Sequence, residues 1–160
     1  MKRIALFPGS FDPFTKGHED IVLRGLRLFD QVVIGIGNNA TKKRYFSLEV
    51  MQELIERTFD KEKNVRVVIY DDLTAHIARE LGATFLLRGL RNTTDFEYEN
   101  GIAQVNRYIY AEIETVFLIT SPHLAPISSS IIRDLHRYGQ SVDDFLPYSL
   151  SELNKLNKFN

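Results

Sequence analysis

Short apolar runs alternate along this chain with longer stretches in which apolar residues recur at helical spacing. The runs predict five strands, at residues 4–7, 31–36, 65–70, 84–87 and 116–120. The longer stretches predict helices at residues 17–29, 48–59, 73–81, 95–110, 128–138 and 149–156. Because strands and helices alternate, we expect an α/β fold with a doubly wound, five-stranded parallel sheet and C-terminal helices.

Composition narrows the class of protein. At 160 residues, the chain is expected to form a single domain over residues 1–160. The absence of cysteine excludes cysteine nucleophiles, thiolate zinc sites and disulfides. The 20 basic and 21 acidic residues give a net charge of −1, so no overall field attracts nucleic acid or an anionic membrane. The apolar run before Pro8 is too short for a signal peptide, and no stretch reaches the length of a transmembrane helix. We therefore expect a soluble, cytoplasmic protein that binds neither nucleic acid nor membrane.

Residues suited to binding or catalysis gather in the loops that follow the predicted strands. These loops span residues 8–18, 38–45, 71–74, 88–93 and 121–130. The carboxyl ends of parallel strands meet at one edge of a doubly wound sheet, where such folds bind their ligands. We therefore expect several of these loops to build one ligand crevice.

The first of these loops ends in Gly17 and His18, which open the predicted helix. A helix N-terminus binds phosphate through its free N–H groups and its dipole. The same dipole disfavours a positive charge, so we expect a mainly neutral His18 in the empty site, whereas a bound polyphosphate would favour a protonated donor. An isolated histidine at a helix start usually has no ligand, but Gly17 beside it and Ser10 and Phe11 across the turn favour a phosphate contact. Asp12, in the same loop, could orient the loop backbone or a metal-bound water.

Arg88 and Arg91 lie three residues apart around Gly89, after the fourth predicted strand. The planar guanidinium of arginine can grip phosphate oxygens in pairs. The spacing therefore suits an anion clamp, and the alternative is that both arginines form surface salt bridges with the acidic residues that follow them.

Two further loops carry candidate phosphate ligands. Ser128, Ser129 and Ser130 open a predicted helix, and helix capping alone needs only one hydroxyl of the three. Lys42 follows the second predicted strand, although a loop lysine is commonly only solvated.

These loops resemble the motifs of a known family. Ser-Phe-Asp-Pro at residues 10–13 with Thr-Lys-Gly-His at 15–18 resembles the TxGH/HxGH signature of the nucleotidylyltransferase superfamily. Arg-Gly-Leu-Arg at 88–91, followed by Asp-Phe-Glu-Tyr-Glu at 95–99, resembles more specifically the phosphopantetheine adenylyltransferases. Ile-Ser-Ser-Ser at 127–130 resembles a further motif of that family. The resemblance covers essentially the whole chain.

The resemblance implies a Rossmann-like nucleotidylyltransferase fold and the transfer of AMP from ATP to 4′-phosphopantetheine. The products would be dephospho-coenzyme A, in coenzyme A biosynthesis, and pyrophosphate. The resemblance also implies Mg²⁺ that accompanies ATP, a homohexamer, and coenzyme A as a feedback inhibitor. No protein metal ligands are expected, because the ATP phosphates and water can hold Mg²⁺.

The resemblance also assigns roles to individual residues. His18 falls on the position that stabilises the transition state. The ATP contacts fall on Ser10, Phe11, His18, Gly89, Leu90, Arg91, Glu99, Leu124, Ala125, Pro126, Ile127, Ser128, Ser129 and Ser130. The contacts to phosphopantetheine fall on Ser10, Lys42, Thr74 and Arg88, and are extended to Ile102 and Asn106 because these share a predicted helix face with Glu99. Thr74 and Leu124 depart from the residues common in the family, which are a larger apolar residue and an aromatic one.

Two alternatives stay open. Another nucleotidylyltransferase, such as a nicotinamide mononucleotide adenylyltransferase or a cytidylyltransferase, would share the first motif, but the residues at 88–99 disfavour it. A non-catalytic nucleotide-binding module would not require His18, so the histidine counts against that alternative.

Overall fold

The structure, a computed structural model, describes residues 2–157 and contains one sheet of five parallel strands. The strands are β1 (Ile4–Gly9), β2 (Gln31–Gly37), β3 (Val65–Tyr70), β4 (Phe85–Leu90) and β5 (Glu114–Ile119). The helices are α1 (Lys16–Gly25), α2 (Leu48–Thr58), α3 (Thr74–Glu80), α4 (Thr93–Ile109), α5 (Ser129–Arg137) and α6 (Leu150–Asn157), with a short 3₁₀ helix η1 (Asp143–Phe145). None of the described helices is both long and apolar enough to cross a membrane.

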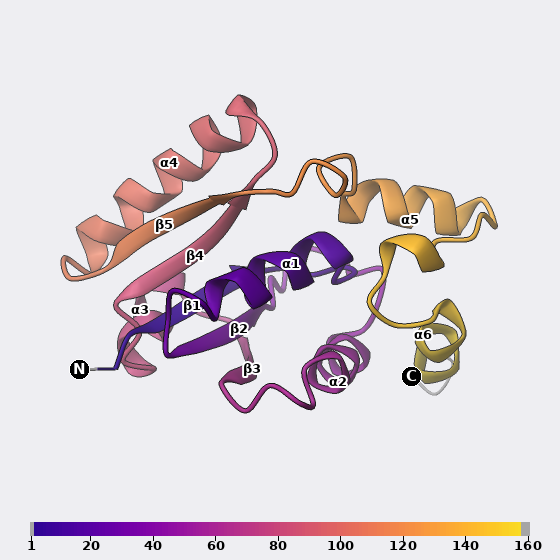
Figure 1. The fold of residues 1–160 in the computed structure, drawn as a ribbon, viewed down its shortest axis with the longest axis horizontal. Coiled ribbons are helices and arrows are strands. Elements are labelled where there is room, and N and C mark those ends of the chain that lie inside the picture. Colours follow the sequence, from indigo (N-terminus) through magenta and orange to yellow (C-terminus); the bar gives the residue numbers. More distant parts are fainter. Residues whose placement is uncertain (1, 158–160) are drawn as a thin grey trace.

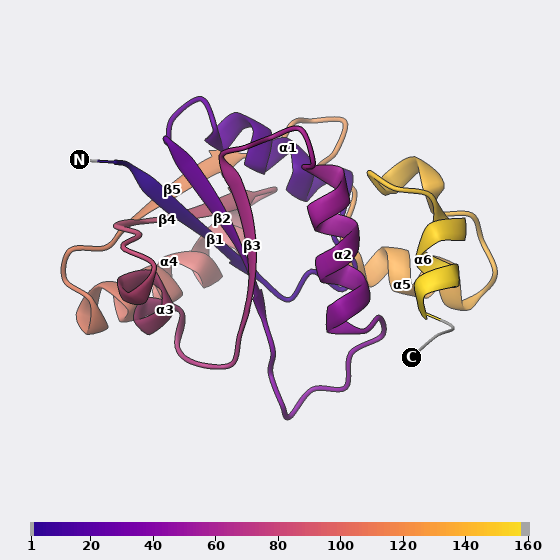
Figure 2. The same ribbon diagram turned by 90° about the horizontal axis from the view of Figure 1, so that it is seen from below.

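Helices cover both faces of the sheet (Figure 1). The helices α1 and α2 pack on one face, over a core that includes Val22, Met51 and Ile55. The helices α3 and α4 lie on the other face (Figure 2), where Ala78 and Leu86 belong to a second apolar cluster. Both views place α5 and α6 together at the end of the molecule away from the N-terminus. The expected doubly wound sheet with C-terminal helices is confirmed.

Side-chain caps fix where four of the helices begin. Thr15, Ser47, Asn92 and Ser128 each precede a helix and accept a hydrogen bond from a backbone N–H of its first turn. Such caps satisfy amide groups that have no partner inside the helix. The loop ahead of each of these helices therefore ends at a defined residue.

The order of the strands, β3-β2-β1-β4-β5, places a topological switch between β1 and β4. Beside β1, β2 pairs along the full strand, whereas β4 is in register at Ala5 and Leu6. Beyond Leu6, the described parts of β1 and β4 no longer pair, so the carboxyl ends of these two strands separate. Doubly wound folds bind ligands at such a point, because the loops diverge to opposite faces of the sheet.

One boundary of the fold differs from the sequence-based expectation in a way that matters for the site. The fourth strand was expected over residues 84–87, but β4 continues to Leu90 and pairs with β5 as far as Ile119. Arg88 and Gly89 therefore lie inside the sheet rather than in a loop. The polar side chain of Arg88 interrupts the apolar run, which is why the strand appeared to end there.

Candidate active site

Two cavities adjoin at the carboxyl ends of the strands. The first has a volume of about 380 Å³ and lies between the loop after β1, the start of α1, the end of β4 and the start of α5. The second has a volume of about 840 Å³ and extends between the loops after β2 and β3 and one face of α4. Ser10, Arg88 and Glu99 line both cavities, so the two spaces share one wall.

The residues expected to contact a nucleotide converge on the first cavity. Those that line it are Ser10, Phe11, His18, Gly89, Arg91, Glu99, Leu124, Ile127, Ser128, Ser129 and Ser130. Leu90, Ala125 and Pro126 were expected there as well, but they do not belong to its lining. The residues expected to contact the acceptor, Ser10, Lys42, Thr74, Arg88, Ile102 and Asn106, all line the second cavity.

His18 is enclosed by aromatic rings at the start of α1. Its imidazole lies 5.0 Å from the ring of Phe11 and 5.3 Å from that of Phe14, centroid to centroid. Burial, and then the nearby cations Arg88 and Arg91, lower the pKa of His18 to about 3. The expectation of a neutral imidazole in the empty site agrees with this shift, but its leading cause is desolvation rather than the helix dipole.

Arg88 is held in the shared wall by a carboxylate. Its Nε donates to Oε2 of Glu99 at 2.7 Å, its Nη2 contacts the other carboxylate oxygen, and its Nη1 donates to the carbonyl of Pro8. Glu99 lies on α4 and is only 8% exposed. The guanidinium therefore fills the gap where β1 and β4 separate, and it is oriented from both sides. Glu99 was expected to contact a nucleotide; the structure shows that it also positions Arg88.

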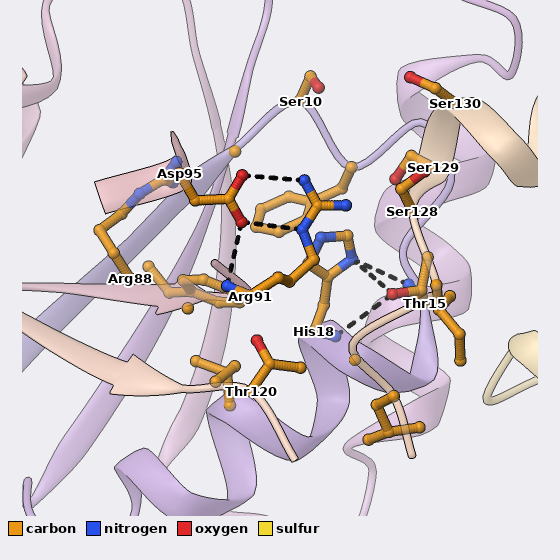
Figure 3. A pocket seen from close by; sticks show the side chains of 18 of the residues that line it. Ser10, Thr15, His18, Arg88, Arg91, Asp95, Thr120, Ser128, Ser129 and Ser130 are labelled. Atoms are coloured by element: carbon orange, nitrogen blue, oxygen red, sulfur yellow. Dashed lines mark hydrogen bonds and ion pairs between the residues drawn. The ribbon is translucent and has the colours of Figure 1, made fainter. Parts of the chain in front are cut away.

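Arg91 is oriented in a similar way above His18 (Figure 3). Its Nε and Nη2 donate to the two carboxylate oxygens of Asp95 at 2.9 and 3.1 Å. This pair raises the pKa of Arg91 and lowers that of Asp95. The backbone N–H of Asp95 is in turn held by the Asn92 side chain at 2.9 Å. The salt bridges considered as an alternative do form, but they orient both arginines along the wall of the first cavity.

The three serines before and within α5 differ in what they bind. Ser128 caps the helix, as its Oγ accepts from the N–H of Ile131 at 3.2 Å. The Ser129 hydroxyl donates to the carbonyl of Pro13 at 2.7 Å. Ser130 accepts from Nη2 of Arg133 at 3.1 Å. Capping therefore accounts for one serine, while the others join α5 to the first loop and to Arg133, and all three face the cavity.

Asp12 orients loop backbone, one of the two roles considered for it. Its two carboxylate oxygens accept from the backbone N–H groups of Tyr45 and Phe46, both at 2.8 Å. Its own carbonyl accepts from Nη1 of Arg133 at 2.7 Å. The loop that carries Lys42 and the helix that carries the serines are therefore both fastened to the first loop.

Several residues of the site were given no individual role by the sequence reasoning. Thr15 and Thr120 line the first cavity, and Tyr70 and Tyr98 line the second. The hydroxyl of Tyr70 lies 3.0 Å from that of Thr74, and burial raises the pKa of Tyr70. The position of Tyr70 at the carboxyl end of a strand was the available signal, because ligand-binding residues of this fold gather there.

The described residues contain no group of three or more acidic or histidine side chains that could hold a metal ion. The carboxylates of the first cavity and of the loop before α1 already bind elsewhere: Asp95 accepts from Arg91, Glu99 from Arg88, and Asp12 from backbone amides. This donor set does not suit an ion held by protein alone.

Comparisons with known proteins agree with this geometry. The sequence profile of the cytidylyltransferase-like family matches residues 6–135. A phosphopantetheine adenylyltransferase of Cytophaga hutchinsonii is 62% identical over 150 residues, which are 94% of this chain and 100% of that protein. Proteins of the same name from Flavobacterium johnsoniae and Streptococcus agalactiae are 52% and 46% identical, covering 91% and 99% of this chain and 95% and 99% of their own.

Solved structures share the fold at low sequence identity. A putative nicotinate-nucleotide adenylyltransferase of Vibrio parahaemolyticus matches with a TM-score of 0.72 and 17% identity, over 98% of this chain and 93% of that one. A bifunctional NMN adenylyltransferase/ADP-ribose pyrophosphatase of Francisella tularensis, complexed with AMP and a manganese ion, matches with a TM-score of 0.68 and 17% identity, over 99% of this chain and 49% of that one. At this identity the likeness concerns the fold alone.

Proposed function

The chain belongs to the cytidylyltransferase-like family and within it to the phosphopantetheine adenylyltransferases, and we propose that it transfers AMP from ATP to 4′-phosphopantetheine. The products are dephospho-coenzyme A, a step of coenzyme A biosynthesis, and pyrophosphate. One observation carries this proposal: two cavities meet at a wall that contains Ser10 and Arg88, beside His18. A nucleotide in the first cavity and an elongated acceptor in the second would bring their phosphates together at this wall.

The reaction needs little covalent chemistry from the protein. An oxygen of the acceptor phosphate attacks the α-phosphorus of ATP, the new O–P bond forms, and the bond to the β-phosphate oxygen breaks to release pyrophosphate. The attacking phosphate is already anionic, so it requires no strong general base. Catalysis then consists of positioning and of stabilising charge on the transferred group.

The residues of the shared wall supply both contributions. Arg88 and Lys42 would hold the acceptor phosphate, and Arg91 with residues 128–130 would hold the ATP phosphates. Because Nδ1 of His18 is taken by Thr15, the other ring nitrogen is the one free to donate to an oxygen of the α-phosphoryl group. Fixed cations and N–H donors in such a site stabilise charge without having to reorganise during the reaction.

Finer properties belong to the same proposal. The metal ion that accompanies ATP is proposed to be Mg²⁺, and the protein is proposed to act in the cytoplasm as one domain over residues 1–160. A homohexamer with coenzyme A as feedback inhibitor is proposed on the basis of the family. Exposed apolar side chains support self-association: Val105 and Tyr108 on α4 are 59% and 91% exposed, and Ile119 at the end of β5 is 69% exposed.

The test is product detection by mass spectrometry. Purified protein is mixed with Mg·ATP and 4′-phosphopantetheine, and parallel reactions contain Mg·ATP with nicotinamide mononucleotide, or CTP with phosphocholine. We expect dephospho-coenzyme A in the first reaction and no product in the others. Turnover of another acceptor alone would contradict the substrate assignment, and inactivity in all three would favour a binding module.

A single substitution then tests the mechanism. In His18→Ala we expect kcat to fall by about 100- to 1000-fold, the typical cost of losing one donor to a transition-state oxygen, while ATP affinity changes little. An unchanged kcat would remove His18 from the mechanism.

A further inference from the structure

Thr15 touches the imidazole of His18 in two ways. It precedes α1 and is 2% exposed, and its Oγ1 accepts a hydrogen bond from the backbone N–H of His18 at 3.3 Å. In return, Nδ1 of His18 lies 3.0 Å from the backbone N of Thr15 and 3.1 Å from its Oγ1 (Figure 3). This is a capping box in which the third helical residue is a histidine rather than the usual glutamate or glutamine.

The backbone N–H of Thr15 determines where the proton of the imidazole lies. A backbone N–H can only donate, so the nitrogen that receives it must present a lone pair. In a neutral imidazole whose Nδ1 accepts, the proton is on Nε2. A proton on Nδ1 would face the N–H of Thr15 and deprive this buried amide of its acceptor.

The remaining surroundings of His18 act on its charge but do not choose between its nitrogens. The rings of Phe11 and Phe14 pack against it, and the cations that act on it are Arg88 and Arg91, each paired with a carboxylate, from Glu99 and Asp95. Desolvation and positive charge oppose an imidazolium, and the hydrogen bonds that reach the ring come from Thr15. The choice between Nδ1–H and Nε2–H is therefore left to Thr15.

We propose that Thr15 is a positioning residue that holds His18 in the neutral Nε2–H tautomer and thereby aims an N–H donor at the transferred phosphoryl group. That the N–H meets a phosphoryl group rests on the proposed function, whereas the tautomer is a property of the free protein. This arrangement also answers how a histidine can donate beside two arginines without first taking up a proton.

The competing explanation is that Thr15 only caps α1. Thr15→Val keeps the branched shape and removes the hydroxyl, and Thr15→Ser keeps the hydroxyl. A matched control is Ser47→Ala, which removes a cap of the same kind from α2, where Oγ accepts from Val50 at 3.2 Å. If Thr15 only caps its helix, Thr15→Val and Ser47→Ala should both lower the melting temperature and leave kcat unchanged.

The experiment reads the tautomer directly. Protein labelled with ¹⁵N-histidine is studied by NMR without substrate between pH 5 and 8, with the His18 signals assigned by their loss in His18→Gln. We expect the Nε2–H form in the wild type and in Thr15→Ser. In Thr15→Val the backbone N–H remains but the hydroxyl that caps the turn is lost, so the N–H is no longer held on Nδ1 and we expect a mixture of tautomers. In Thr15→Val we also expect kcat to fall about tenfold, the worth of one hydrogen bond, with little change in the KM for ATP.

Each result decides the proposal. An Nδ1–H form or an imidazolium in the wild type would overturn it, and that measurement stands even if Thr15→Val does not fold. A folded Thr15→Val variant with the wild-type tautomer and the wild-type kcat would also overturn the proposal. Because the NMR measurement uses no substrate, an Nε2–H wild type that makes no dephospho-coenzyme A would contradict the proposed function and leave the tautomer assignment intact.

Discussion

Gly17 offers a test in which stability and ligand binding should change in opposite directions. It lies in the first turn of α1 and lines the first cavity. A Cβ built on this residue would meet Oγ1 of Thr15 at 3.4 Å, an ordinary contact, and no other atom outside its own helix within 4 Å. Nothing within the described protein therefore requires a glycine here, whereas a nucleotide packed closely over the start of α1 would.

Two opposing effects are expected for Gly17→Ala. Alanine in place of glycine inside a helix raises the free energy of unfolding by roughly 0.5–1 kcal/mol, and in the first turn we expect a value near the lower limit. A methyl group that intrudes on a closely packed nucleotide should cost about 1–3 kcal/mol of binding, which is about a 5- to 150-fold rise in the Kd for ATP. The variant should thus be slightly more stable than the wild type and bind ATP distinctly less well.

Gly101→Ala is the matched control. Gly101 also lies in a helix, α4, is exposed, and would place its Cβ where no atom lies within 4 Å. It should gain stability without losing affinity. Urea unfolding without ligand measures stability, and isothermal titration calorimetry measures the Kd for ATP. If Gly17→Ala bound ATP as tightly as Gly101→Ala does, the nucleotide would not pass over the start of α1 and our assignment of the first cavity would be wrong.

Three further changes probe other parts of the site. Because the pKa of His18 falls from an ordinary 6.5 to about 3 on folding, the unfolded chain binds the extra proton between these values and stability falls as pH falls through them. In His18→Gln the free energy of unfolding should therefore fall less steeply with falling pH, by up to about 1.4 kcal/mol per pH unit, in urea unfolding at pH 7, 6 and 5. If the wild type and the variant had the same pH slope, the pKa shift of His18 would be contradicted. Tyr148→Phe removes a donor 2.7 Å from the Phe14 carbonyl and should cost about 1–3 kcal/mol in unfolding with kcat preserved, and an unaltered melting temperature would refute it. Asp12→Asn leaves one of two backbone amides without its acceptor, so the loop that carries Lys42 should loosen. The KM for phosphopantetheine should then rise more than the KM for ATP, and wild-type KM values would count against Asp12 as the anchor of that loop.

The sequence predicted the elements and the convergence of the loops well, because both follow from local pattern. Apolar periodicity located every strand of the described sheet, and the rule that ligands bind at the carboxyl ends of strands placed the loops in one crevice. The end of β4 was misjudged because Arg88 is a charged residue inside a strand. No periodicity could show that a buried carboxylate on α4 would compensate this charge.

What the sequence could not predict is how the loops are joined, since the bonds connect residues far apart in the chain. The Asp12 side chain binds backbone amides 33 and 34 positions further along the chain. Arg133 binds the carbonyl of Asp12 across 121 positions, and Ser129 binds that of Pro13 across 116. For the two arginines that were expected to form a clamp, the sequence gave no indication of which acidic residue would orient each one. Contacts of this kind depend on the tertiary fold and leave no mark on local spacing.

These long-range hydrogen bonds all involve the first loop, between β1 and α1. This explains why that loop carries so much of the family's recognisable sequence motif. The carboxylate of Asp12 fastens the loop before α2, its carbonyl fastens Arg133, and the carbonyl of Pro13 fastens Ser129. The first loop is thus the reference from which the linings of both cavities are positioned. Catalysis by positioning requires reacting groups to be held within a fraction of an ångström, so residues that only orient backbone become as necessary as those that meet the phosphates. On this reasoning Asp12 and Thr15 belong to the functional signature although neither needs to touch a substrate.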